Sequence, residues 1–336
     1  MILRRILFLS ICLIIPAFAG LFAVEYNEGN VRLVINEKTG SYSLFYLSDP
    51  VKMRYEPLFY SGDPTSSFLE VNYDGKIYRP VKSNQFRIRF EEVNENPSIA
   101  FESEFVKVRQ VFTFIKTASS ETFNGINVAI TVQNMQIRAA SIGLRVLIDT
   151  HLGEGFRKTH FVTNNQSVSK ETLIENTSGE MYWISRGPRV SLMGNIVDPM
   201  DNYGRIPDIY MANWKRLNKA KWNFNYSEGR SLSYFPYFFS DSAVCYYYDS
   251  AFLEGGETAT YNIYLTGEDI PWYTGAFPDL NLAPEEEAKY EDANLIMLHN
   301  LQEILNQFIF GDKNLDEGDL EEIEGTIEWL KAGDTY

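Results

Sequence analysis

Apolar and polar positions alternate along most of this chain, from about residue 24 to residue 267. An alternation with a period of two residues predicts strands that bury one face and leave the other in water. Asp74-Gly75 lies between two such runs and favours the type I′ turn of a β-hairpin. Gly40 suits a left-handed turn position between two others. The expected strands are residues 31–35, 42–47, 68–73, 76–81, 86–90, 105–115, 126–134, 142–149, 242–249 and 258–267.

Many short strands and an aromatic content of 15% indicate a mainly β protein. We expect a large antiparallel β-sandwich over residues 24–269, in which Phe and Tyr fill the core. Residues 198–230 interrupt the alternation, because this stretch is long, polar and aromatic. Loops of this length in compact domains usually carry function or cover another part of the fold.

The period changes near the C-terminus. Residues 270–284 resemble a linker, and residues 285–336 predict an acidic tail of two amphipathic helices forming a hairpin. Its apolar stripes could pack on each other, on the sandwich or on a partner. The first stripe is Leu298, Leu301, Leu305 and Phe308, and the second is Leu320, Ile323, Ile327 and Leu330.

The first 23 residues have the features of a signal peptide. Arg4 and Arg5 precede a short apolar run, and small residues suited to cleavage follow it at 17–19 or 21–23. We therefore expect a periplasmic or secreted protein. Loss of Cys12 with the signal would leave Cys245 as the only cysteine, so no disulfide could form within one chain.

The net charge is −15, and removal of the signal would make it about −17. Residues 284–336 hold fifteen Asp and Glu against three Lys and Arg, a net charge of −12. An acidic chain argues against nucleic acid and anionic lipid as partners. No segment after the signal is long and apolar enough to predict a membrane span.

Several sequence pieces together resemble a β-sandwich domain of exported bacterial proteins. They are VNYDGKIY, GLRVLIDTHLG, IPDIYMANW and DSAVCYYYDSAFLEGGETATYNIYLTG, in this order over roughly residues 30–268. The family pattern couples a "GLR-x-x-x-DT-x-x-G" strand end with "DSAV-x-x-Y". The resemblance implies a supersandwich similar in outline to galactose-mutarotase-like domains, and it implies no activity. Residues 156–161 depart from the family pattern, so a polar site there would be altered or lost.

Asp149, His151, Glu154 and His160 are the candidates for chemistry, because they cluster around the end of one expected strand. Imidazole and carboxylate groups could bind a metal ion or serve as acid and base. The spacing matches no metalloenzyme motif, so we predict no metal site. The alternative to a functional site is a structural turn, with Arg145 and Asp149 available for ordinary cross-strand ion pairs.

Trp214, Trp222 and Tyr226 could stack on a sugar as a ligand site, although large aromatic side chains are also common in sandwich cores. Residues 311–324 resemble a calcium loop, but Glu317 replaces the required Gly, and an acidic helix start fits better. No phosphate-binding loop, dinucleotide fingerprint or nucleophile elbow is present, so no cofactor is expected.

These observations favour an exported, non-enzymatic β-sandwich protein. It would act as an interaction or scaffold module of the cell envelope, accessory to a periplasmic or motility assembly, and dock on an envelope protein through its acidic tail. The alternative is a carbohydrate-binding or carbohydrate-active, mutarotase-like enzyme that uses Asp149, His151 and Glu154. The two hypotheses differ in whether these groups converge or point separately into solvent.

Overall fold

The computed structural model of the chain describes residues 23–117, 120–154, 160–198, 205–232 and 241–267. The predicted sandwich lies mostly within these residues. Residues 1–22 of the expected signal peptide, the linker at 270–284 and the helical tail at 285–336 lie outside the described residues. Those three predictions therefore stay predictions.

The described strands form three sheets, and every strand pair in them is antiparallel. The four-stranded sheet has the order β1 (Ala23–Glu28), β2 (Val31–Asn36), β3 (Ser41–Asp49) and β4 (Arg54–Pro57). The six-stranded sheet has the order β14 (Thr172–Ile174), β17 (Asp208–Asn213), β18 (Ser242–Leu253), β11 (Ala140–Asp149), β5 (Phe68–Tyr73) and β6 (Lys76–Tyr78). The nine-stranded sheet has the order β13 (Ser167–Val168), β12 (Phe161–Thr163), β15 (Tyr182–Arg186), β16 (Ser191–Asn195), β19 (Thr258–Thr266), β10 (Gly125–Asn134), β9 (Val106–Ile115), β8 (Asn96–Glu102) and β7 (Arg87–Val93).

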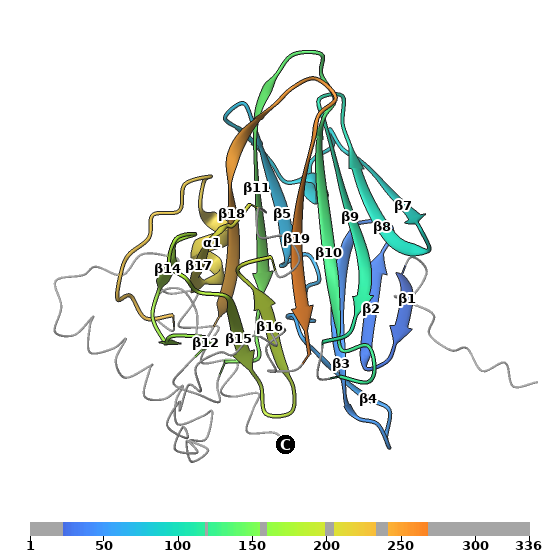
Figure 1. Cartoon of the computed structure of the whole chain (residues 1–336), viewed down its shortest axis with the longest axis vertical. Coiled ribbons are helices and arrows are strands. Elements are labelled where there is room, and N and C mark those ends of the chain that lie inside the picture. Colours follow the sequence, from blue (N-terminus) through green and yellow to red (C-terminus); the bar gives the residue numbers. More distant parts are fainter. Residues whose placement is uncertain (1–22, 118–119, 155–159, 199–204, 233–240, 268–336) are drawn as a thin grey trace, which may run out of the picture.

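The three sheets make two layers. One face of the nine-stranded sheet packs against the six-stranded sheet, where the rings of Tyr248 and Tyr261 lie 4.6 Å apart. The same face also packs against the four-stranded sheet, where the rings of Tyr42 and Phe112 lie 4.8 Å apart. In Figure 1 the long strands β18 and β11 run beside β19 and β10. The predicted antiparallel sandwich is confirmed for the described residues.

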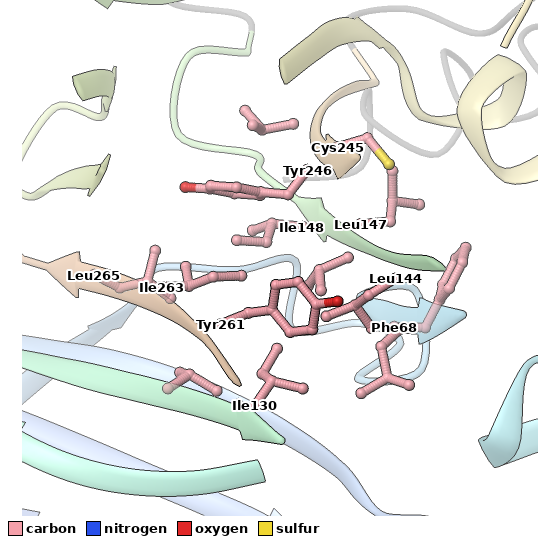
Figure 2. Packing of buried hydrophobic residues seen from close by; sticks show 14 of the residues in the cluster. Phe68, Ile130, Leu144, Leu147, Ile148, Cys245, Tyr246, Tyr261, Ile263 and Leu265 are labelled. Carbon is pink, nitrogen blue, oxygen red and sulfur yellow. The ribbon is translucent and has the colours of Figure 1, made fainter. Parts of the chain in front are cut away.

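The core lies between the layers and follows the alternation of the sequence. Figure 2 shows Ile130, Tyr261 and Ile263 of the nine-stranded sheet opposite Leu144 and Ile148 of β11. All five side chains are at most 3% exposed. Burying large apolar side chains on both inner faces is the main stabilising contribution available to such a fold.

Two predicted turns are confirmed. Asp74 and Gly75 have φ values of +50° and +83°, as a type I′ turn requires, and Tyr73 pairs with Lys76 across it. Gly40 has a φ of +68°. A further turn of this kind between β7 and β8 was not expected, because it uses Asn94 and Glu95 and contains no glycine.

Residues 198–230 are not the plain loop that the sequence predicts. This stretch includes β17 of the six-stranded sheet, followed directly by helix α1 (Trp214–Lys219). The Asn213 side chain caps the helix by accepting a hydrogen bond from the backbone N–H of Lys215 at 3.0 Å. The other described helix is the short 3-10 turn Pro80–Lys82. Within the described ranges, no helix is sufficiently long and apolar to cross a membrane.

Candidate functional site

The end of β11 meets the start of β18 at a buried polar junction. The Thr150 backbone N–H donates to the Ser242 carbonyl oxygen at 3.2 Å, and the Ser242 hydroxyl donates back to the Thr150 carbonyl oxygen at 3.3 Å. Around this contact the chain gathers the carboxyl groups of Asp149, Glu154 and Asp241, which act on one another electrostatically. We call these three residues, together with Ser242, the carboxyl junction.

Glu154 is tied to the chain itself. Its Oε1 accepts a hydrogen bond from the Ser242 backbone N–H at 2.5 Å and lies 3.1 Å from the Ser242 hydroxyl, whose single hydrogen it shares with the Thr150 carbonyl oxygen. Burial raises the pKa of Glu154 to about 9; the charges of Asp241 and Asp149 raise it further, whereas the two hydrogen bonds from Ser242 oppose the shift. The Glu154 carboxyl is therefore protonated at neutral pH.

Asp149 and Asp241 share this environment. Burial raises the pKa of Asp149 to about 7, and the charges of Asp241 and Asp63 add to the effect, whereas a hydrogen bond with Ser66 opposes it. Burial also raises the pKa of Asp241 to about 6, although Lys215 lowers it. Among the described residues, no cation forms an ion pair with these carboxyls, and this explains why desolvation dominates.

The two histidines have different surroundings. His151 is half-buried, burial lowers its pKa, and the charge acting against that shift belongs to Glu56 rather than to the junction. His160 is 6% exposed, and burial lowers its pKa to about 4, so it is neutral at pH 7. The described parts of the chain contain no group of three or more His, Cys, Asp or Glu arranged to hold a metal ion.

The three aromatic candidates lie over the outer face of the six-stranded sheet or at its border. Trp214 is half-buried, and its indole N–H donates to the Ser66 carbonyl oxygen at 2.9 Å. The Trp222 ring lies so close to Gly143 that a Cβ there would be 2.7 Å from it. Tyr226 is half-buried and packs on the core.

A second polar cluster lies on the same strand, β11. Arg145 faces Glu70 in the register of β11 and β5, and their side chains form an ion pair while 1% and 6% exposed. Arg79 adds a second ion pair to Glu70 at 2.8 Å. The predicted cross-strand pairing of Arg145 is confirmed, although the pair is buried. The expected role of Asp149 in such pairs is wrong for the described residues. We call Glu70, Arg79 and Arg145 the Glu70 cluster.

The Glu70 cluster holds the segment after α1 on the sheet. Arg145 donates to the carbonyl oxygens of Ala220 at 3.1 Å and Lys221 at 2.9 Å, and to the Tyr247 hydroxyl at 2.8 Å. Arg79 donates to the Asn218 side chain at 2.9 Å. The buried guanidinium group of Arg145 thus anchors the segment that leads into Trp222, which explains why this segment lies over β11 and β18.

Asp241, Ser242 and Glu70 were not among the candidates that the sequence predicted. A signal for the first two was present, because Asp241-Ser242 begins the "DSAV" piece and Asp149-Thr150 ends the "GLR-x-x-x-DT" piece. The structure shows that these two pieces meet at the carboxyl junction. Glu70 gave no such signal, because a single carboxylate in an alternating strand predicts a solvent-facing side chain.

No protein-family model matches this chain, and no curated protein is significantly similar to it. Among solved structures it is similar to a galactose mutarotase related enzyme from Lactobacillus acidophilus, with 10% identity and a TM-score of 0.43 over 74% of this chain and 98% of that one. A galactose mutarotase-like protein from Lactobacillus casei gives 10% identity and a TM-score of 0.35, over 73% and 99% of the two chains. A TPR-domain containing protein from Parabacteroides distasonis gives 11% identity and a TM-score of 0.43, over 91% of this chain and 60% of that one. Likenesses at this level carry no argument about activity, and the fold follows from the strand pairings themselves.

Proposed function

We propose that this chain is an exported, non-enzymatic interaction module that docks on another protein of the cell envelope. The acidic tail expected from the sequence remains one proposed docking element. The observation that carries the proposal is a set of large apolar side chains held in water at one end of the sandwich. Ile137 and Phe252 are 101% and 81% exposed, and Met135 is 47% exposed.

These three residues lie where two short connections between strands meet. Met135 and Ile137 belong to the loop between β10 and β11, and Phe252 lies near the end of β18, both at the top of Figure 1. The loops touch, because a Cβ at Gly255 would be 2.3 Å from the Ile137 carbonyl oxygen. We call this the hairpin end. Grouped exposed apolar residues are typical of interaction sites.

Charge at the hairpin end points to the kind of partner. Arg138 is paired with Asp74 at 2.8 Å, so its charge is compensated. Glu104, Glu254 and Glu257 are exposed and have no ion pair among the described residues. The surface therefore fits a protein with an apolar groove bordered by Lys or Arg, and it would be repelled by anionic lipid.

The polar groups of the candidate site support a structural role. The Glu154 carboxyl is hydrogen-bonded to Ser242, and the Asp149 side chain is only 5% exposed. Groups that are satisfied within the chain are poorly placed to contact a substrate. This arrangement favours an interaction module over an enzyme.

Photo-crosslinking in cells of the source organism tests the proposal. A benzoylphenylalanine at Ile137 should give one main protein adduct in the envelope, and Phe252→Ser should reduce it several-fold. Mass spectrometry of the adduct identifies the partner protein. The purified partner should bind the unmodified chain, and it should bind the Ile137→Ser variant at least tenfold more weakly. The matched control is a benzoylphenylalanine at Glu121, an exposed position on the loop between β9 and β10. Equal adducts at both positions, or binding of the purified chain to neutral phosphatidylcholine vesicles instead, would overturn it.

A second candidate function is acid/base chemistry on a carbohydrate. One observation favours it, namely that Asp149 and Asp241 have pKa values of about 7 and about 6, near the operating pH of a general acid or base. Polarimetry with purified protein and a panel of aldoses tests it. Accelerated anomer exchange that Asp149→Asn abolishes would favour the enzyme over the module.

A further inference from the structure

The opposite end of the sandwich also exposes apolar side chains, in a basic setting. Val51 and Met53 belong to the turn between β3 and β4 and are 92% and 63% exposed. The turn extends at the bottom of Figure 1. We call Val51, Lys52, Met53 and Arg54, together with Arg189 of the turn between β15 and β16, the basic turn end.

This end has a surplus of positive charge. Arg54 and Arg189 both contact the same oxygen of Glu56, at 2.8 and 2.7 Å, so one carboxylate serves two guanidinium groups. Both arginine side chains are about half exposed, at 52% and 50%. Lys52 is 77% exposed and lies 3.8 Å from Asp49, at the limit of an ion pair. An acidic partner would gain contacts here without displacing a buried pair.

The chain leaves its last described strand at this same end. The Gly267 backbone N–H donates to the Asn124 carbonyl oxygen at 3.1 Å, and Gly267 lies against the ring of Tyr46. Tyr46 is on β3 and pairs with Glu56 on β4. Gly267, to which residues 268–336 are attached, therefore lies beside the hairpin that carries Val51 and Met53.

The sequence of that C-terminal segment complements the basic turn end. Residues 284–336 have a net charge of −12 and two apolar stripes at helical spacing. Residues 268–284 can span up to about 55 Å when extended, so the stripes can reach any part of this end. Attachment through a short linker also raises the effective concentration to the millimolar range, which a free protein rarely matches.

We propose that the acidic C-terminal segment binds the basic turn end of its own domain. One apolar stripe covers Val51 and Met53, and neighbouring carboxylates face Lys52, Arg54 and Arg189. One stripe suffices for this contact, so the other remains for the envelope protein. The contact is independent of the hairpin end, which lies at the far end of the long strands.

Cysteine crosslinking in the full chain tests this contact. Val51→Cys is combined with Leu305→Cys in one variant and with Ile327→Cys in another, and a short bismaleimide is added. Cys12 is replaced by serine, and the native Cys245 is 1% exposed and does not compete. At least one variant should give an intramolecular crosslink whose yield is unchanged on tenfold dilution. Adding Arg54→Ser and Arg189→Ser, or raising the salt concentration, should reduce that yield several-fold.

The matched control moves the first cysteine to Ile137, which is equally exposed but lies at the hairpin end. Its crosslinking yield should be at least fivefold lower. Equal yields at positions 51 and 137, crosslinks only between two chains, or no crosslink in either variant would overturn the proposal. None of these outcomes bears on the adduct expected at Ile137 in the envelope, so the two proposals can fail separately.

Discussion

The Glu70 cluster and the carboxyl junction each include one residue of strand β11, but buried charge is compensated in only one of them. Arg145 and Asp149 both belong to β11, four residues apart, and both are at most 5% exposed. In the cluster one carboxylate meets two guanidinium groups, and the charges compensate. In the junction three carboxyls meet without an ion pair among the described residues, and the pKa of each is raised, far enough at Glu154 to keep its proton at neutral pH. Burial alone therefore does not decide ionisation; the partner does.

The largest effect should come from breaking the compensated cluster. Arg145→Met leaves Glu70 with half of its ion pairs and frees the carbonyl oxygens of Ala220 and Lys221. We expect a loss of about 3–5 kcal/mol in the free energy of unfolding, measured by urea denaturation. The control is Arg109→Met, whose ion pair with Glu91 is about one-third exposed and should contribute at most about 1 kcal/mol. Equal losses in the two variants would contradict the comparison.

A smaller loss is expected at the contact that the cluster positions. A Cβ at Gly143 would lie 2.7 Å from the Trp222 ring and 2.6 Å from the Ser250 hydroxyl oxygen. Gly143→Ala should therefore cost about 1–3 kcal/mol of unfolding free energy and change the tryptophan fluorescence. Adding Trp222→Leu should restore part of the stability. Strictly additive losses would show that the two residues do not press on each other.

The carboxyl junction should make the free energy of unfolding depend on pH. Because the pKa of Glu154 rises from 4.5 to about 9 on folding, the folded state binds more protons between those values. Its contribution to stability is present in acid and is lost as the pH rises toward 9. In the Glu154→Gln variant, the unfolding free energy should therefore fall less between pH 5 and pH 9 than it does in the unmodified chain.

The control for this pH dependence is Glu102→Gln. A hydrogen bond from Lys107 lowers the pKa of Glu102, so its contribution is present above pH 4.5 and is lost in acid. The two variants should change the pH profile in opposite directions, which thermal unfolding across the pH range would detect. Parallel profiles would count against the protonated junction.

The smallest change concerns Cys245, which lies near Arg145. Burial raises the pKa of this thiol to about 12, although Arg145 opposes the shift, so almost no thiolate forms at neutral pH. In a chain without Cys12, we expect no measurable reaction of Cys245 with a thiol reagent in the folded protein and complete reaction in urea. Rapid labelling without denaturant would show that the cluster opens.

Each of the ten strands that the alternation predicted overlaps an observed strand, because alternating apolar and polar residues mark a strand with one buried face. Strands β1, β4, β8 and β12 to β16 were not predicted. Ile142, Leu144, Val146 and Ile148 are buried as expected, despite a bulge between the first two. The junction was predicted only in part. Asp149 and Glu154 were chosen for lying near each other in the chain, whereas Asp241 directly precedes a strand that begins about ninety residues later. Pairing between distant strands is not visible in a local pattern.

The helix α1 and strand β17 were missed for a different reason. Asn218 of α1 and the two carbonyl oxygens just after the helix are bound by Arg79 and Arg145, which are distant in the sequence, so no local period marks the helix. His151 was grouped with Asp149 because the two alternate in sequence, but the chain turns after β11 and brings His151 toward Glu56. Tertiary contacts, rather than local preference, decide these positions.

The place of β19 has a consequence for the order in which the domain assembles. This strand is the last of the described residues, yet it lies between β10 and β16 inside the nine-stranded sheet. Until residues 258–266 are available, the sheet remains two separate halves with unpaired edges at β10 and β16. Such long-range closure is slow and leaves edges that invite aggregation. Assembly is therefore a late event that needs nearly the whole domain, and a chain cut before Thr258 would have no intact sandwich.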